Sequence, residues 1–213
     1  MSLRINEIYF SIQGESTHMG RPCIFIRLTY CNLRCTYCDT EYAFYDGNDM
    51  EISEILDKIK KWNCNLVEVT GGEPLFQNEC TDLLIELTNT GYEVLLETGG
   101  SLAISNIPKE VKKIVDFKCP SSGMEKKNLW SIVKDLESHD EVKFVIGDRE
   151  DFDWAKEKIL HYKLENKCVV LMSPTFDEIE PQQIVEWILA ENMPVRMQIQ
   201  MHKHIWKPEV KGV

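Results

Sequence analysis

The chain has 213 residues, 43% of them hydrophobic, which is enough to bury one sizeable core and predicts a single domain over residues 1–213. Its 24 Lys and Arg residues are outnumbered by 35 Asp and Glu, and the resulting formal charge of −11 disfavours direct binding to nucleic acid or to anionic membranes. The N-terminus lacks the apolar run of a signal peptide and no segment approaches the roughly 20 apolar residues that span a bilayer, so we expect a cytoplasmic protein.

Runs rich in Val, Ile and aromatic residues alternate with amphipathic runs along the chain. The predicted strands are residues 22–30, 65–69, 92–98, 112–118, 141–147, 168–173 and 195–200. The predicted helices, which space apolar residues three and four apart, are residues 51–62, 80–91, 128–138, 151–162 and 181–192. We expect Asp49 to cap the first helix and Gly91 to end the second. This alternation predicts a mostly parallel sheet with right-handed crossovers.

Three loops that directly follow predicted strands are candidates for a functional site. CNLRCTYCDT follows the strand at 22–30, TGGEPL follows the strand at 65–69, and CPSSG follows the strand at 112–118. The C-terminal ends of parallel strands share one edge of a sheet, so these loops should lie near one another. They would bring thiols, bare backbone and hydroxyl groups to one place.

Cys31, Cys35 and Cys38 form a compact group, whereas the other five cysteines are isolated. A disulfide is not expected in a reducing compartment. Structural zinc takes four protein ligands, commonly as two close pairs, and no second pair is present in the sequence. An iron–sulfur cluster also prefers thiolates, and three of them on a cubane leave one iron open to a small-molecule ligand. The group therefore indicates an iron–sulfur cluster, with zinc as the alternative.

The spacing Cys31-x3-Cys35-x2-Cys38, together with TGGEP, resembles the radical S-adenosylmethionine (SAM) enzymes. Members of that superfamily bind a 4Fe–4S cluster and cleave SAM to a 5'-deoxyadenosyl radical. Longer blocks, among them INEIYFSIQGES (5–16), DFKCPSSG (116–123) and QMHKHIW (200–206), resemble the 7-carboxy-7-deazaguanine synthases. These blocks are spread over the whole chain.

This resemblance implies a fold and a reaction. The fold would be an abbreviated, partial (β/α) barrel of about six mostly parallel strands, of radical SAM type. The reaction would convert 6-carboxy-5,6,7,8-tetrahydropterin to 7-carboxy-7-deazaguanine with release of ammonia, in queuosine and 7-deazapurine biosynthesis. The resemblance also implies Mg²⁺, a homodimer and an electron donor such as flavodoxin or ferredoxin.

The site residues follow from the resemblance position by position. The substrate would contact Ile12, Gln13, Gly14, Arg27, Thr70, His202 and Val213. SAM would contact Tyr37, Cys38, Asp39, Gly72, Glu73, Ser121 and Ser122, with Lys118 and Lys143 as further candidates. Thr40 would bind Mg²⁺, and Cys31, Cys35 and Cys38 would hold the cluster. A guanidinium suits a carboxylate, a glycine pair lets the backbone approach a ligand, and a hydroxyl suits a hard cation.

Simpler interpretations exist for several of these residues taken one at a time. Arg27 could be an exposed strand arginine, Thr40 a loop cap, the serine pair a turn, and His202 a surface residue with His204 as its rival. Ser16 also departs from the family's QGEG sequence. Two other functions remain possible at this stage: a small radical SAM activase that installs a glycyl radical on a partner protein, and a non-catalytic protein that holds zinc or a passive cluster.

Overall fold

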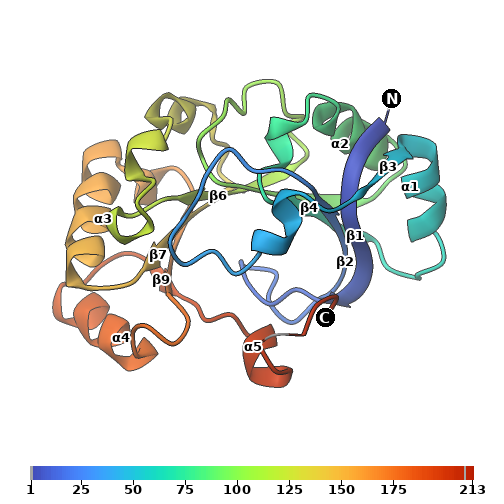
Figure 1. Cartoon of the computed structure of the whole chain (residues 1–213). Helices are drawn as coiled ribbons and strands as arrows, with labels where there is room; N and C mark the ends of the chain where they lie inside the picture. The colour runs from blue at the N-terminus through green and yellow to red at the C-terminus, as the bar shows by residue number, and fades with distance from the viewer. Residues whose placement is uncertain (1, 209) are drawn as a thin grey trace.

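The computed structural model describes residues 2–208 and 210–213, and one nine-stranded sheet forms its centre. The sheet is curved and runs in the order β3-β1-β2-β4-β5-β6-β7-β8-β9, so β3 and β9 form its two edges (Figure 1). The strands are β1 (Ser2–Ile12), β2 (Pro22–Leu28), β3 (Asn48–Glu51), β4 (Leu66–Gly71), β5 (Glu93–Thr98), β6 (Lys112–Phe117), β7 (Glu141–Ile146), β8 (Val169–Pro174) and β9 (Arg196–Met197). The helices are α1 (Ile52–Ile59), α2 (Cys80–Asn89), α3 (Arg149–Tyr162), α4 (Pro181–Ala190) and α5 (His202–Ile205). Within the described residues, no helix is long and apolar enough to cross a membrane.

The parallel part of the sheet confirms the predicted fold class. β2, β4, β5, β6, β7 and β8 pair in parallel with their neighbours, and the two-residue strand β9 extends this set. β1 breaks the pattern, because it pairs antiparallel with both β2 and β3. The result is a partial barrel of mostly parallel strands with an antiparallel addition at one edge.

The predicted helix at 128–138 is wrong, because this segment contains the short 3-10 helix Trp130–Asp135. The Asn128 side chain donates to the carbonyl oxygen of Lys118 and accepts from its backbone N–H, both at 2.9 Å. The Trp130 ring stacks on Tyr162 with a centroid distance of 4.5 Å. These tertiary contacts hold the segment in a conformation that its amphipathic pattern does not reveal.

Other differences concern the ends of elements. The sequence did not predict β1 or β3, and the predicted strand at 195–200 is reduced to β9. Glu51 caps α1 in a reciprocal capping box with Glu54, whereas Asp49, the predicted cap, lies within β3. Gly91 follows α2 as predicted, with a φ of 90°.

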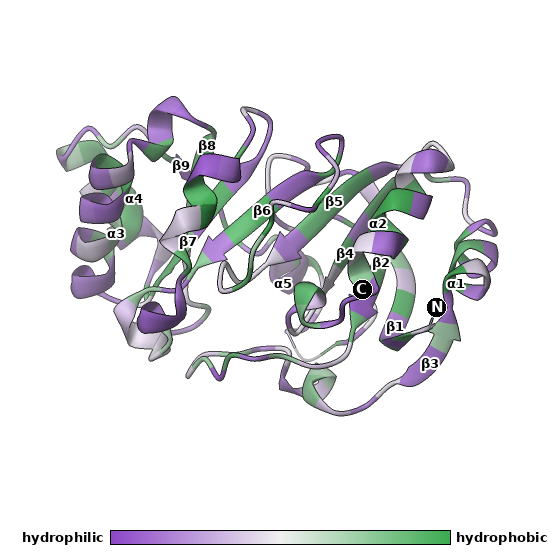
Figure 2. Ribbon diagram, turned by 90° about the horizontal axis from the view of Figure 1, so that it is seen from above, coloured by the Kyte–Doolittle hydropathy of each residue, from purple (hydrophilic) through white to green (hydrophobic). Residues whose placement is uncertain are grey.

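The parallel strands bury one face against helices and turn the other toward the inside of the barrel. Helices α1 to α4 lie around the outside of the curved sheet (Figure 1). The core on that outer side includes Ile24, Ile26, Val67, Val69, Val115, Phe144 and Met172 from strands and Ile55, Leu83, Phe152 and Ile184 from helices. On the inner face, a smaller apolar cluster contains Cys23, Phe25, Leu66, Leu95 and Ile114. Figure 2 shows hydrophilic residues at the arrowheads of β5 and β6, where the strands end.

Residues 13–21, which join β1 to β2, cover the N-terminal ends of three strands on the inner side. Thr17 hydrogen-bonds to Glu141, the first residue of β7, and accepts from Lys112, the first residue of β6, at 2.7 Å. Arg21 binds Glu93, the first residue of β5, through two hydrogen bonds of 2.8 and 2.6 Å. These bonds lower the pKa of Glu93 to about 2. The loop thus covers the N-terminal ends of these strands, and the three candidate site loops lie at the C-terminal ends.

A buried ion pair on the outer side gives a test of this fold. The Lys113 ammonium is 2% exposed and lies 3.0 Å from Asp140 Oδ2, and Asp140 also accepts from the backbone N–H of Glu137 at 2.7 Å. Lys113→Met leaves a buried carboxylate without its cation, so we expect urea denaturation to show a loss of about 3 kcal/mol in the free energy of unfolding. Lys109→Met removes an exposed, screened pair and should leave the unfolding midpoint almost unchanged. Equal effects of the two substitutions would contradict this account.

Candidate active site

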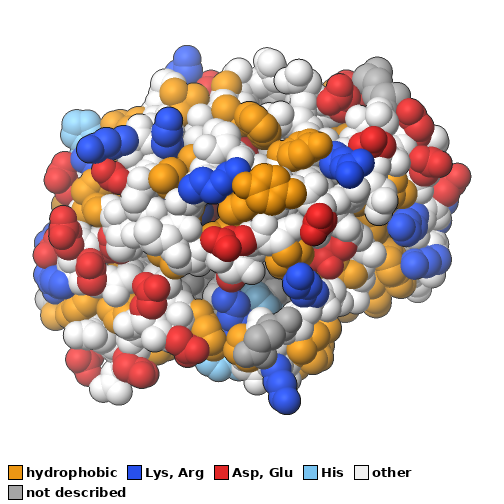
Figure 3. Space-filling view, viewed as in Figure 1, with side chains coloured by type: hydrophobic (Ala, Val, Ile, Leu, Met, Phe, Trp, Pro, Cys, Tyr) orange, Lys and Arg blue, Asp and Glu red, His pale blue; other side chains and the backbone are white. Residues whose placement is uncertain are grey.

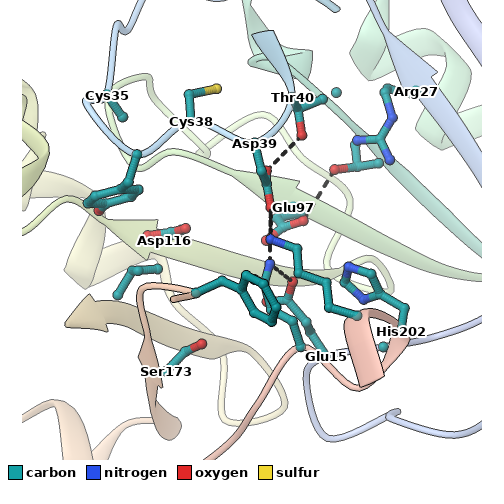
Figure 4. Close-up of a pocket in the computed structure, with 18 of the residues that line it drawn as sticks. Glu15, Arg27, Cys35, Cys38, Asp39, Thr40, Glu97, Asp116, Ser173 and His202 are labelled. Carbon is teal, nitrogen blue, oxygen red and sulfur yellow. Dashed lines mark hydrogen bonds and ion pairs between the residues drawn. The ribbon is translucent and has the colours of Figure 1, made fainter. Parts of the chain in front are cut away.

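A cavity of about 780 Å³ lies at the C-terminal ends of the parallel strands. Each of six strands contributes a polar side chain to its wall: Arg27 from β2, Thr70 from β4, Glu97 from β5, Asp116 from β6, Lys143 from β7 and Ser173 from β8. Figure 4 shows Arg27, Glu97, Asp116 and Ser173 around this space. Successive strand residues point to opposite faces, so the same period that packs the outer core brings these groups together. The volume suits a small-molecule site.

Most of the residues predicted for the site line this cavity. They are Ile12, Gln13, Gly14, Arg27, Cys31, Cys35, Tyr37, Cys38, Asp39, Thr40, Thr70, Gly72, His202 and Val213, with the further candidates Lys118 and Lys143. Glu73, Ser121 and Ser122 are not part of its lining. His204, the rival of His202, lines a smaller neighbouring pocket instead.

The cysteine loop, residues 31–40, brings three free, half-buried thiols to the cavity. Burial raises the pKa of Cys31, Cys35 and Cys38, that of Cys35 to about 11, so bound metal would be needed to hold them as thiolates at neutral pH. Across residues 2–208 and 210–213, no three His, Cys, Asp or Glu side chains form a group that could hold a single metal ion. A 4Fe–4S cubane does not require the three thiolates to meet at one ion, because each thiolate would bind its own iron. Three soft thiolate donors suit such a cluster.

The same cavity contains polar atoms that lack a protein partner. Tyr37 Oη, Asp116 Oδ1 and Thr175 Oγ1 are buried, and each has no hydrogen bond within the described part of the chain. A buried polar atom left unpaired costs about 1–3 kcal/mol, so such atoms usually meet a ligand or water. The cavity wall therefore fits a polar ligand of the size of SAM beside the cysteine loop.

Gly71 and Gly72 allow the loop after β4 to pack directly against the start of the cysteine loop. A Cβ at Gly72 would overlap the carbonyl oxygen of Tyr30 and lie 2.7 Å from Cys31 Cβ. Gly71 has a φ of 143°, a conformation that other residues rarely adopt, and a Cβ there would meet the backbone of Leu28. The glycine pair is thus required by backbone packing and also lies on the cavity wall.

Glu73, predicted to contact SAM, is fully buried and already saturated with protein hydrogen bonds. Its carboxylate accepts from the Thr98 hydroxyl at 2.9 Å, from the Gly99 N–H at 2.7 Å and from the Leu75 N–H at 3.1 Å. Although these bonds favour the ionised form, burial raises the pKa of Glu73 above its ordinary value. In this structure Glu73 ties the loop after β4 to the loop after β5.

Ser121 and Ser122 likewise hold loops together rather than facing the cavity. Ser121 donates from its N–H at 2.9 Å and from its hydroxyl to the Asp151 carboxylate, and the Ser122 hydroxyl donates to the carbonyl oxygen of Cys119. Their own carbonyl oxygens accept from Thr36, from its hydroxyl at 2.7 Å and its N–H at 3.2 Å. The serine pair thus fixes the cysteine loop between Cys35 and Cys38.

Arg27 lies in a cluster of phenols and one carboxylate. Its Nε donates to Glu7 Oε1 at 2.7 Å and its Nη2 to Tyr9 Oη at 2.9 Å, while Tyr42 Oη donates to the same Glu7 oxygen at 3.0 Å. Burial raises the pKa of Tyr9 to about 12, which keeps the phenol neutral. The C-terminal segment reaches the same wall, with the Lys211 ammonium 3.9 Å from the centroid of the Tyr42 ring. Arg27 is therefore not the exposed strand arginine of the simpler interpretation.

Gly14 and His202 bring the two ends of the chain into contact, and Gln13 precedes Gly14 on the same cavity wall. A Cβ at Gly14 would overlap His202 Nδ1, and the Gly14 carbonyl oxygen accepts from the Met201 N–H at 3.0 Å. The Gln13 amide donates to the buried Glu68 carboxylate. Burial lowers the pKa of His202 below its ordinary value, which favours the neutral imidazole. A neutral ring can both donate and accept a hydrogen bond.

Thr40 and Asp39 place oxygen atoms beside the cysteine loop. The Thr40 hydroxyl donates to Asp39 Oδ1 at 2.9 Å (Figure 4). Asp39 Oδ2 accepts from Lys203 at 2.7 Å and from Gln200 at 3.3 Å. Burial opposes ionisation, but the Lys203 ammonium holds the pKa of Asp39 below its usual range. Hydroxyl and carboxylate oxygens are the donors that Mg²⁺ prefers, so this corner fits that ion in donor type.

A charge network that the sequence motifs do not indicate lies on the cavity wall. The Lys143 ammonium lies 3.0 Å from Glu15 and 3.4 Å from Asp116, and it also binds Glu97. Burial opposes the charge of Lys143, yet the Glu15 and Glu97 carboxylates hold its pKa well above the usual value. Burial, with the same two carboxylates, raises the pKa of Glu68 well above its usual value. The sequence did contain a sign of this network, because Glu97 and Lys143 are charged residues within predicted strands.

Known proteins resemble this chain over almost its entire length. Residues 25–188 match the model of the radical SAM superfamily. The 7-carboxy-7-deazaguanine synthase of Koribacter versatilis is 44% identical over 226 residues, covering 99% of this chain and 100% of the relative. That of Chlorobaculum tepidum is 42% identical over 214 residues, covering 99% and 97%. In fold, the crystal structure of QueE from Escherichia coli superposes with a TM-score of 0.80 at 23% identity, covering 95% of each chain.

The glycine pair provides a test of how the cysteine loop is positioned. Gly72→Ala introduces a Cβ that overlaps Tyr30 and Cys31, so the loop must shift, and we expect several-fold less iron and sulfide per chain after anaerobic reconstitution. Gly91→Ala is the control, because its φ of 90° imposes backbone strain but nothing lies within 4 Å of the added Cβ. That variant should bind as much iron as the unmodified chain. Full iron loading of Gly72→Ala would show that the close approach is dispensable.

Proposed function

The chain belongs to the 7-carboxy-7-deazaguanine synthase family of the radical SAM superfamily, and from this premise we propose that it converts 6-carboxy-5,6,7,8-tetrahydropterin to 7-carboxy-7-deazaguanine with release of ammonia. This ring contraction belongs to queuosine and 7-deazapurine biosynthesis. The observation that carries the proposal is one cavity that gathers the cysteine triplet, the glycine pair, Arg27 and His202. The whole-length similarity to synthases favours this reaction over the glycyl-radical activase and over a non-catalytic metal protein.

Membership of the superfamily implies a 4Fe–4S cluster and SAM. Cys31, Cys35 and Cys38 would hold three irons and leave one for SAM, and together the two cofactors supply the one-electron chemistry that starts the reaction. Tyr37, Asp39 and the backbone of Gly72 line the same space and would orient SAM. The predicted SAM contacts of Glu73, Ser121 and Ser122 stay predictions, and the loops that these residues fix would shape the SAM site.

The opposite wall suits a pterin carboxylate. Arg27 uses Nε and Nη2 within the described chain, and Nη1 remains as the nitrogen that could meet a second carboxylate. Ile12, Gln13, Gly14, Thr70, His202 and Val213 line the remaining surface and would contact the ring system. Neutral His202 can hydrogen-bond to either a donor or an acceptor on the ring. The chain's contribution is to bind the pterin beside SAM and to exclude water.

The proposal also includes a Mg²⁺ ion, an electron donor, a homodimeric assembly and a cellular compartment. Thr40 would bind Mg²⁺ through its hydroxyl, beside Asp39. The electron donor would be a protein such as flavodoxin or ferredoxin, the assembly a homodimer, and the compartment the cytoplasm. Acidic side chains are scattered among basic ones on the face shown in Figure 3, and the net charge of −11 does not favour direct contact with RNA or DNA.

Arg27 and Thr40 should act on substrate and Mg²⁺ rather than on the cluster. Arg27→Ala removes the carboxylate partner, so we expect KM for the pterin to rise at least about tenfold with a smaller change in kcat. Thr40→Ala should raise the Mg²⁺ concentration needed for half-maximal rate. Both variants should keep the visible absorbance of the cluster. Loss of that absorbance in either variant would refute the assigned role.

The reaction itself is tested with the reconstituted, reduced protein under anaerobic conditions. With substrate deuterated at C6, we expect 7-carboxy-7-deazaguanine as product, deuterium in the recovered SAM, and many turnovers per SAM supplied. Cys35→Ala should form no product, whereas Cys64→Ala, which changes an isolated cysteine, should remain active. One 5'-deoxyadenosine released per product would contradict the catalytic use of SAM. Activation of a glycyl-radical partner without any deazapurine would instead identify an activase.

A further inference from the structure

Lys118, named above as a further candidate for contact with SAM, is a half-buried cation beside the cysteine loop. It directly follows β6, and the strand period puts it on the cavity face with Ile114 and Asp116. Its side chain is 13% exposed, and its ammonium lies 3.0 Å from Asp116 Oδ2. The Asn128 side chain hydrogen-bonds to both the backbone N–H and the carbonyl oxygen of Lys118. The position of Lys118 is therefore fixed at both the backbone and the charged end.

The neighbouring loops bring Lys118 close to the cysteines. The segment that follows Lys118 accepts two hydrogen bonds from Thr36, which lies between Cys35 and Cys38. A Cβ built at Gly99 would lie 3.7 Å from Lys118 Cε and 2.9 Å from Leu33 Cδ1, so Gly99 separates the lysine stem from the cysteine loop by one small residue. The absence of a side chain at Gly99 leaves this approach open.

A second cation lies in the cysteine loop itself. Arg34 is exposed, and it donates to the carbonyl oxygens of Cys31 and Leu33. A charge in a poorly hydrated site acts more strongly than one at the surface.

Two other cations on the cavity wall have carboxylate partners of their own. Lys143 binds Glu15 and Glu97, and Arg27 binds Glu7. Lys118 has one ion-pair partner within the described residues, Asp116 Oδ2, and that oxygen is shared with Lys143 at 3.4 Å. The Asp116 carboxylate is thus shared between two ammonium groups, so its ion pair compensates the charge of Lys118 only in part.

We propose that Lys118 raises the reduction potential of the 4Fe–4S cluster that Cys31, Cys35 and Cys38 would hold. This inference rests on the proposed function, because it needs the cluster. Reduction adds one electron, supplied by an external low-potential donor, and therefore one unit of negative charge to a site that is already anionic. A fixed ammonium nearby stabilises the reduced form more than the oxidised form. Lys118 would make the cluster easier to reduce without contacting the substrate.

The test measures the midpoint potential of the cluster, without SAM or substrate, by an anaerobic dithionite titration followed by electron paramagnetic resonance. Lys118→Met keeps the length of the stem and removes the charge. We expect its equilibrium constant for reduction to fall at least tenfold, which is about 59 mV toward more negative potential for a one-electron couple. Lys118→Gln should shift in the same direction, and Lys118→Arg should stay near the unmodified value.

Lys127→Met is the matched control, because it makes the same change in net charge at an exposed position close to Lys118 in sequence. It should leave the potential unchanged. Unaltered potentials in both neutral variants, or an equal shift in Lys127→Met, would overturn the proposal. Folded neutral variants that bind no cluster would also overturn it, since Lys118 would then serve cluster assembly. An unmodified chain that bound no 4Fe–4S cluster would refute the proposed function itself.

Discussion

The two-residue period of six parallel strands is the constraint on which the rest of the structure depends. One face of each strand must be apolar, because it packs against the helices outside, and the other face is free to carry polar groups. Near the strand ends that other face carries Arg27, Glu97, Asp116 and Lys143. Charges inside a barrel are costly unless they are paired, and each of these four has an oppositely charged partner. The cavity wall is thus both a binding surface and a compensated charge network.

Side-chain hydrogen bonds tie the loops above this wall to one another. Glu73 joins the loop after β4 to the loop after β5, and Thr36 joins the cysteine loop to the loop after β6. Because Gly71 and Gly72 have no side chains, the loop after β4 can pack directly against Cys31. Residues that resemble ligand contacts in sequence therefore act in this structure on the geometry of the loops. A substitution at Glu73 would change the site even without a direct contact to SAM.

Local sequence patterns predicted the parts of the fold that depend on local interactions. The strands β4 to β8 and helices α1 to α4 have clear apolar periods and were found within a few residues. β1 was missed because Arg4, Asn6 and Glu7 interrupt its apolar residues and its pairing with β2 and β3 is not visible in the sequence. The segment 128–138 has a helical pattern, but contacts of Asn128 and Trp130 with distant residues decide its conformation.

The residues of the candidate site also differ in whether local sequence reveals them. Cys31, Cys35 and Cys38 could be recognised because all three lie within one loop, and their spacing carries the chemistry. Glu15 and Lys143 were harder to recognise, since their ion pair joins positions 128 residues apart. His202, which the resemblance to a known family singled out, lines the main cavity, whereas the residue type alone could not separate it from His204. Spacing thus predicts the three candidate cluster ligands, and only the fold brings their charged neighbours together.

The contact between the first loop and the C-terminal segment has a consequence for biosynthesis of the protein. Ser16 bonds to Gln198 and Glu15 to Gln200, across separations of 182 and 185 residues. Loop closure over such distances is among the last steps for a chain made from its N-terminus. While the chain is still on the ribosome, the early strands and helices can form, but Gly14 and Ser16 lack their partners Met201 and Gln198. The wall formed by this loop and the C-terminal segment is therefore complete only after residues 198–202 have been synthesised.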